Sequence, residues 1–164
     1  MGGRSVPQIE VGRRSDLVEV HLLALPIEVH RAASEHSDEL QREFALLRVQ
    51  QSDEDTPDVP ARLLALIDDL GERFAGFTES TEADLEDAMD RGDESIDLVF
   101  RVPPAAKEAA EALGALLDEA DDFCRTGGLM TLATPAEAVA YRRWYLEEFT
   151  RQIDGLPPAP WSGA

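Results

Sequence analysis

Apolar side chains recur along this chain with two different periods. Alternation of apolar and polar residues predicts a strand over residues 16–25 and a second strand over residues 95–102. Spacings of three and four residues predict helices over residues 26–49, 103–124 and 135–153. We therefore expect an α+β fold that is predominantly α-helical, with four or five helices and two short strands.

The segment of residues 58–92 predicts two helices rather than one. Gly71 and Gly76 weaken the tendency of the chain to continue as a single straight helix. Thr81 offers a new N-cap, because its hydroxyl can accept a hydrogen bond from the first turn of a helix. We therefore expect a separate short helix from about Thr81, ended by Gly92.

The order strand, proline, helix, helix occurs twice. A shift of about 77 positions places Pro26 on Pro103, as in a diverged internal repeat. We therefore predict two strand–helix–helix halves, residues 16–92 and 95–155, around a small paired sheet within one globular domain of residues 16–155.

The two ends of the chain differ from this domain. Residues 1–15 are rich in Gly and Arg without a sustained period, which predicts a flexible segment. Residues 156–164 contain three prolines that forbid further helix. We expect an extended tail here that Trp161 pins to the body of the protein.

The helix over residues 135–153 has the clearest pattern in the chain. Thr134 as N-cap and Glu137 three residues later predict a capping box, with Pro135 at the first helical position. Tyr141 and Tyr145 recur at helical spacing and are assigned mainly to the core.

Composition narrows the class of protein. With 164 residues, 43% of them hydrophobic, the chain is long enough for one globular domain. Its net charge of −19 repels nucleic-acid phosphates and anionic membranes, so we expect it to bind neither. The sequence has no apolar run that could span a membrane, and Cys124 cannot form an internal disulfide, so we expect a cytoplasmic protein. Cys124 itself is typical of a small core residue.

The strongest functional hypothesis from residue types is a protein-binding surface. Trp, Tyr and Arg are enriched at interface hot spots, and the C-terminal helix places arginines beside a tryptophan. A charged face of the first helix complements it. The predicted partner-binding residues are Glu35, His36, Glu39, Arg42, Arg142, Arg143 and Trp144.

Two other functions remain open. Glu35, His36, Glu39 and Glu43 share one helical face, so a metal-dependent or acid–base enzyme is an alternative, although a helical metal site usually needs ligands from facing helices. The many acidic residues also allow a protein that mimics nucleic acid.

No motif assigns a catalytic residue, a cofactor or a metal ligand, and a phosphoacceptor role for His36 lacks a matching motif. A homodimer through a strand edge or the C-terminal helix also remains open.

Residues 25–44, 116–125, 132–135, 142–149 and 157–161 together resemble a family of small actinobacterial proteins. Their genes tend to lie beside those of anti-sigma-factor ATP-binding kinases and STAS-domain antagonists. The resemblance covers roughly residues 17–161, the globular part of the chain. It implies a regulatory component of a partner-switching system whose partner is the kinase or the STAS-domain protein. The chain lacks the ATP-binding motifs of the former, and no phosphoacceptor motif of the latter is evident.

Overall fold

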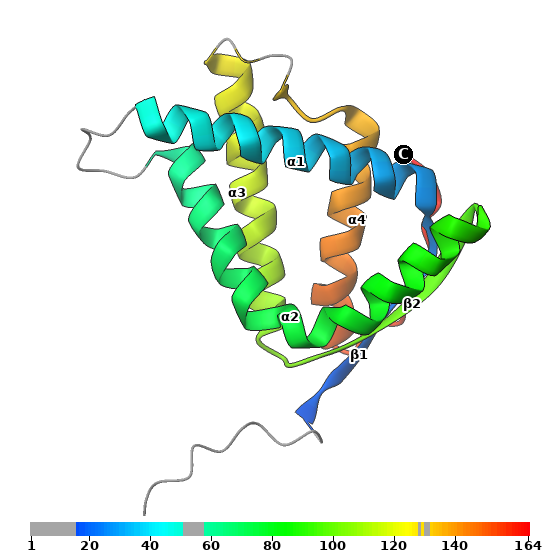
Figure 1. Ribbon diagram of the computed structural model, residues 1–164. Coiled ribbons are helices and arrows are strands. Elements are labelled where there is room, and N and C mark those ends of the chain that lie inside the picture. The colour runs from blue at the N-terminus through cyan, green and yellow to red at the C-terminus, as the bar shows by residue number, and fades with distance from the viewer. Residues whose placement is uncertain (1–15, 51–57, 128, 130–131) are drawn as a thin grey trace, which may run out of the picture.

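The computed structural model describes residues 16–50, 58–127, 129 and 132–164. The predicted flexible segment of residues 1–15 lies outside the described residues. The chain runs in the order β1 (Val18–Pro26), α1 (Ile27–Gln50), α2 (Val59–Arg91), β2 (Ser95–Val102), α3 (Ala106–Thr126) and α4 (Ala136–Ile153). Figure 1 shows α1 and α2 framing α3 and α4. The predicted α+β class and the two strand–helix–helix halves are confirmed.

The two strands pair in antiparallel orientation and bury one face of their sheet. Val20 lies opposite Phe100, and Leu22 lies opposite Leu98. The register then shifts by one residue, because Ala24 adopts a left-handed φ of 54° and its N–H donates to Asp97 Oδ1 at 2.7 Å. This bulge turns Leu25 back to the buried face. The side chains on that face are Val20, Leu22, Leu25, Leu98, Phe100 and Val102.

A side chain protects the outer edge of β1. The amide of Gln152 on α4 accepts from His21 N and donates to His21 O, both at 2.8 Å. The backbone N of Trp161 donates to Leu23 O at 3.0 Å. These contacts satisfy backbone groups that a third strand would otherwise satisfy, so the edge does not need one.

The C-terminal tail returns across α4. The indole Nε1 of Trp144 donates to Ala159 O at 2.9 Å, and the ring of Trp144 lies 5.6 Å from that of Trp161, centroid to centroid. The buried Glu148 accepts from Ala159 N at 3.0 Å and is paired with Arg151. The prediction that Trp161 pins the tail is therefore confirmed.

The prediction of two helices between residues 58 and 92 is wrong, because α2 is continuous. The hydroxyl of Thr81 donates to Thr78 O at 2.7 Å and that of Thr78 to Ala75 O at 3.3 Å. Both hydroxyls therefore bond to carbonyls of their own helix and cap no new one. The helix begins with Asp58 as N-cap, whose Oδ1 accepts from Ala61 N, and ends at Gly92 with a φ of 74°.

Figure 1 shows that α2 changes direction along its length. Its first arm packs against α3 and its second arm against β2. The change of direction accompanies Gly71, Gly76 and the two threonines that bond back to the helix, which are features that weaken or bend a helix. Gly71 and Gly76, from which two helices were predicted, therefore lie within a single bent helix.

The predicted capping box at the start of α4 is also wrong. Thr134 gives its hydroxyl to Asp121 Oδ1 at 2.6 Å, and its backbone N donates to the same oxygen at 3.1 Å. Pro135 takes the N-cap position without a side-chain bond. The buried carboxylate of Asp121 on α3 therefore accepts the Thr134 N–H that the Glu137 side chain would accept in a capping box, and it holds the chain at the start of α4.

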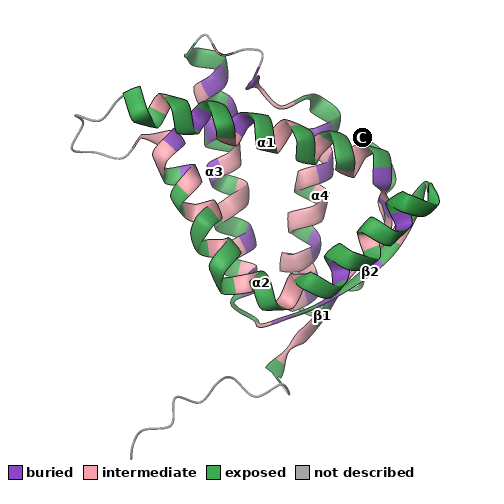
Figure 2. Cartoon of the chain, viewed as in Figure 1, coloured by how far each residue is buried: buried purple, intermediate pink, exposed green. Residues whose placement is uncertain are grey.

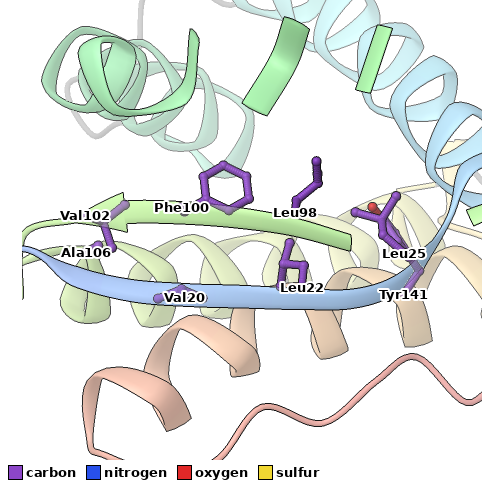
Figure 3. Packing of buried hydrophobic residues seen from close by; sticks show 8 residues of the cluster. All are labelled: Val20, Leu22, Leu25, Leu98, Phe100, Val102, Ala106 and Tyr141. Carbon is purple, nitrogen blue, oxygen red and sulfur yellow. The ribbon is translucent and has the colours of Figure 1, made fainter. Parts of the chain in front are cut away.

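Buried apolar residues form two clusters. The first joins the inner face of the sheet to α3 and α4, and Figure 3 shows its eight residues, among them Phe100 and Tyr141. The second lies away from the sheet, where α1, α2 and α3 meet, and contains Leu40, Phe44, Leu63, Leu116, Ala120, Cys124 and Leu132. Figure 2 shows half-buried positions along α4, between α1 and the second arm of α2.

We predict that alanine at Gly71 or Gly76 stabilises the protein. A Cβ at either position meets nothing within 4 Å, and neither glycine has a positive φ. Each substitution should raise the free energy of unfolding by roughly 0.5–1 kcal/mol, measured by urea denaturation, because alanine loses less backbone entropy in a helix. A loss of stability in either variant would show that the bend of α2 needs glycine there.

Candidate functional site

One feature with functional potential is an apolar groove between the two core clusters. One cavity of about 230 Å³ lies between α1, α3 and α4, and a second of about 210 Å³ lies between α2, β2, α3 and α4. Both open to solvent. Leu113, Tyr145 and Leu146 line both cavities and form the ridge between them. We call the two cavities and this ridge the central groove.

Leu146 is the most informative residue of the central groove. It lies on α4 with its Cδ1 toward Gly114 of α3, where an added Cβ would be 3.5 Å away. It lines the groove, yet it belongs to neither core cluster, and the same is true of Leu70 on α2. Apolar side chains that pack in neither core and line open cavities are candidates for contact with another molecule.

One end of the groove is closed by a histidine–tyrosine pair. His30 Nδ1 lies 2.6 Å from the hydroxyl of Tyr141, and the two rings meet edge to face. Burial lowers the pKa of His30, while burial and the neighbouring Tyr145 raise the pKa of Tyr141. Both side chains are therefore neutral near pH 7, and Tyr141 donates its proton to Nδ1.

This proton position argues against a nucleophile at Ser34. Its hydroxyl lies 3.4 Å from His30 Nε2, so the order Ser34–His30–Tyr141 has the outline of a catalytic triad. The proton of the Tyr141 hydroxyl has no other acceptor among the residues that the structure describes. Nδ1 is then the acceptor and Nε2 carries the hydrogen, which is the wrong tautomer for removing a proton from serine.

The residues predicted on α1 lie on a different side of that helix. Glu35, Glu39 and Arg42 are exposed, and Glu35 is paired with Arg31 at 3.0 Å. His36 is half-buried, and its Nε2 has no hydrogen-bond partner among the described residues. The groove is instead lined on α1 by His30, Ala33, Ser34 and Ser37.

The predicted residues on α4 divide between two places. Arg142 lies 2.6 Å from Asp118 and 2.8 Å from Asp121, with 14% of its side chain exposed. Burial of Asp118 opposes its ionisation, but the bonds and charges of Arg142 and Arg143 together outweigh this and lower the pKa of Asp118. Arg143 is more exposed and reaches the same carboxylate, whereas Trp144 holds the tail. The structure therefore does not gather the seven predicted residues into one surface.

The structure gives the metal hypothesis no support. Among the residues it describes, no three His, Cys, Asp or Glu side chains group closely enough to hold a metal ion. These four residues, Glu35, His36, Glu39 and Glu43, lie along a single helix, and no facing helix in the described part of the chain supplies further ligands. Cys124 is fully buried, and burial raises its pKa, so its thiol is a core residue as predicted.

The residues of the central groove have no distinctive local signal in the sequence, so the sequence does not predict the groove. Tyr145 was assigned to the core, and Leu113 and Leu146 read as ordinary apolar positions of two amphipathic helices. Only the arrangement of four helices shows that these side chains remain accessible.

No family model, no curated protein and no solved structure matches this chain. None of the helices in the described part of the chain is long and apolar enough to cross a membrane.

The His30–Tyr141 pair predicts a pH dependence of stability. Histidine has a pKa of about 6.5 in an unfolded chain, and burial lowers it in the fold. The unfolded state therefore binds more protons, so stability should fall as the pH drops from about 6.5 through the lowered pKa. Urea denaturation across this range should show that the free energy of unfolding falls more steeply with decreasing pH in the wild type than in His30→Asn. Parallel curves would contradict the assignment.

Proposed function

We propose that this protein is a non-enzymatic regulatory component of the cytoplasm that acts by binding another protein. The observation that carries the proposal is the central groove, whose ridge of Leu113, Tyr145 and Leu146 is accessible and apolar. Accessible apolar surface of this kind is costly in water and is a common feature of protein-binding sites.

The polar groups around the groove support binding over catalysis. Arg142 is committed to Asp118 and Asp121, and His30 is committed to Tyr141. These bonds leave the groove with mainly apolar walls and, among the described residues that line it, no free nucleophile–base pair, since the Ser34–His30 contact has the wrong tautomer. An apolar groove without reactive groups can hold a side chain but supplies little to a reaction.

The resemblance to small actinobacterial proteins suggests which partner to test first. It points to an anti-sigma-factor kinase or its STAS-domain antagonist. In such a system this chain would be an accessory binder whose occupancy changes the availability of the other two proteins.

The test is calorimetric titration of the purified chain with each of these two proteins. We expect one of them to bind, and Leu146→Gln to weaken that binding by about tenfold or more, because a buried leucine contributes about 1.5–3 kcal/mol. Leu46→Gln is the matched control, since Leu46 is 58% exposed and lies outside the groove. If folded wild-type protein binds neither candidate, the proposed system is wrong.

A further inference from the structure

The walls of the central groove restrict the kind of segment it can accept. They come from α1, α2, α3 and α4, and the sheet contributes only Phe100 and Val102, whose side chains lie on its buried face. Within the described residues the groove therefore offers no strand edge for a partner to extend. A segment that enters must satisfy its own backbone hydrogen bonds, and an α-helix does so.

The shape of the groove fits side chains that project from one face of a helix. Its two cavities, of about 230 and 210 Å³, lie on either side of the ridge. Each is smaller than the roughly 300–1,000 Å³ usual for pockets that hold drug-sized molecules. Each suits a bulky apolar side chain, and a helix presents such anchors on one face at spacings of three, four and seven residues.

The charge beside the groove identifies the flanks of that helix. The C-terminal part of α2 begins directly after Thr78, which lines the cavity of about 210 Å³ between α2, β2, α3 and α4. It carries six exposed acidic residues that form no ion pair within the described part of the chain: Glu79, Glu82, Asp84, Glu86, Asp87 and Asp90. Besides burial, the charge of Glu82 raises the pKa of Tyr145, which places negative charge next to the ridge.

The opposite wall adds to this field. On α1, Asp38 is exposed and forms no ion pair with any described residue. It follows Ser37, which lines the cavity of about 230 Å³ between α1, α3 and α4. The protein as a whole carries a charge of −19. The cations beside the groove are paired, Arg142 with Asp118 and Asp121 and Arg73 with Asp69. The unpaired carboxylates on both sides of the apolar floor therefore attract a segment with basic flanks, and they repel a second copy of this chain.

We infer that the central groove binds an amphipathic α-helix of a partner protein, with bulky apolar anchors on one face and Lys or Arg on both flanks. The inference rests on the proposed function and adds the chemistry of the partner segment. The anchors enter the two cavities across the Leu113–Tyr145–Leu146 ridge. The basic flanks face Asp38 on one wall and Glu79 and Glu82 on the other.

Three labelled peptides of about 20 residues test the inference, a length at which an isolated helix can form. The first has leucines on one helical face and lysines on both flanks. The second replaces every lysine with glutamate. The third keeps the composition of the first but distributes its leucines around the helix. Binding is measured by fluorescence anisotropy against the full-length protein.

The first peptide should bind the wild type, and the other two should bind at least about tenfold more weakly. Leu146→Gln and Leu70→Gln should each weaken binding of the first peptide, whereas Leu46→Gln should not. Using two groove variants keeps the test valid if one of them fails to fold, which circular dichroism shows.

Charge reversal separates local from general electrostatics. The double variant Glu79→Lys with Glu82→Lys should bind the lysine peptide more weakly than the wild type does and the glutamate peptide more tightly. Glu43→Lys with Glu137→Lys makes the same change of net charge at exposed positions outside the groove, and it should have a smaller effect on both. Equal effects of the two pairs would overturn the role of the groove walls.

Other outcomes overturn the inference in distinguishable ways. Equal binding of the first and third peptides would show general attraction to an acidic protein and no recognition of an apolar face. A wild-type dimer that Leu146→Gln dissociates would assign the groove to a second copy of the chain. If a protein partner binds through Leu146 but no peptide does, the proposed function stands and the helical partner segment is wrong.

Discussion

A sheet of only two strands limits how much apolar surface this chain can bury in one place. The sheet has one inner face, with six buried side chains, and it must serve four helices of up to 33 residues. The outer edge of β1 bonds to the side chain of Gln152 and to the tail at Trp161, and within residues 16–50, 58–127, 129 and 132–164 no further strand extends the sheet on that side. The helices therefore bury the rest of their apolar residues against one another, in a second cluster away from the sheet.

The central groove is a consequence of having two clusters. The bent α2 serves both, because its first arm packs on α3 and its second arm packs on β2. Between the two clusters, apolar side chains of α3 and α4 line cavities that open to solvent. A polar clasp of Asp118, Asp121 and Arg142 holds α3 and α4 together beside the groove. The groove can therefore stay formed without an occupant, which lowers the cost of binding.

The sequence predicts the elements of this fold better than their relations. The sequence predicts the strand Ser95–Val102 from the alternation of its residues and the start of the helix after Pro26 from the proline. Both signals act within a few residues. Thr81 led to a wrong prediction because a threonine hydroxyl can either cap a new helix or bond to a carbonyl of its own helix, and here the buried Thr81 bonds to Thr78 O. The capping box predicted at Thr134 is wrong because Asp121, on the preceding helix, accepts the hydrogen bond of the Thr134 hydroxyl. Nothing in the sequence around Leu146 indicates that its side chain lines an open cavity, because that depends on how the helices pack in the tertiary structure.

The central claim is that partners contact the ridge between the two cavities. The most direct measurement is methyl NMR on leucine- and valine-labelled protein during titration with the lysine-flanked peptide. The account predicts that the methyl signals of Leu70, Leu113 and Leu146 shift, whereas those of the exposed Leu46 and Leu156 stay in place. Shifts confined to Leu46, Leu156 or other methyls outside the groove would contradict it.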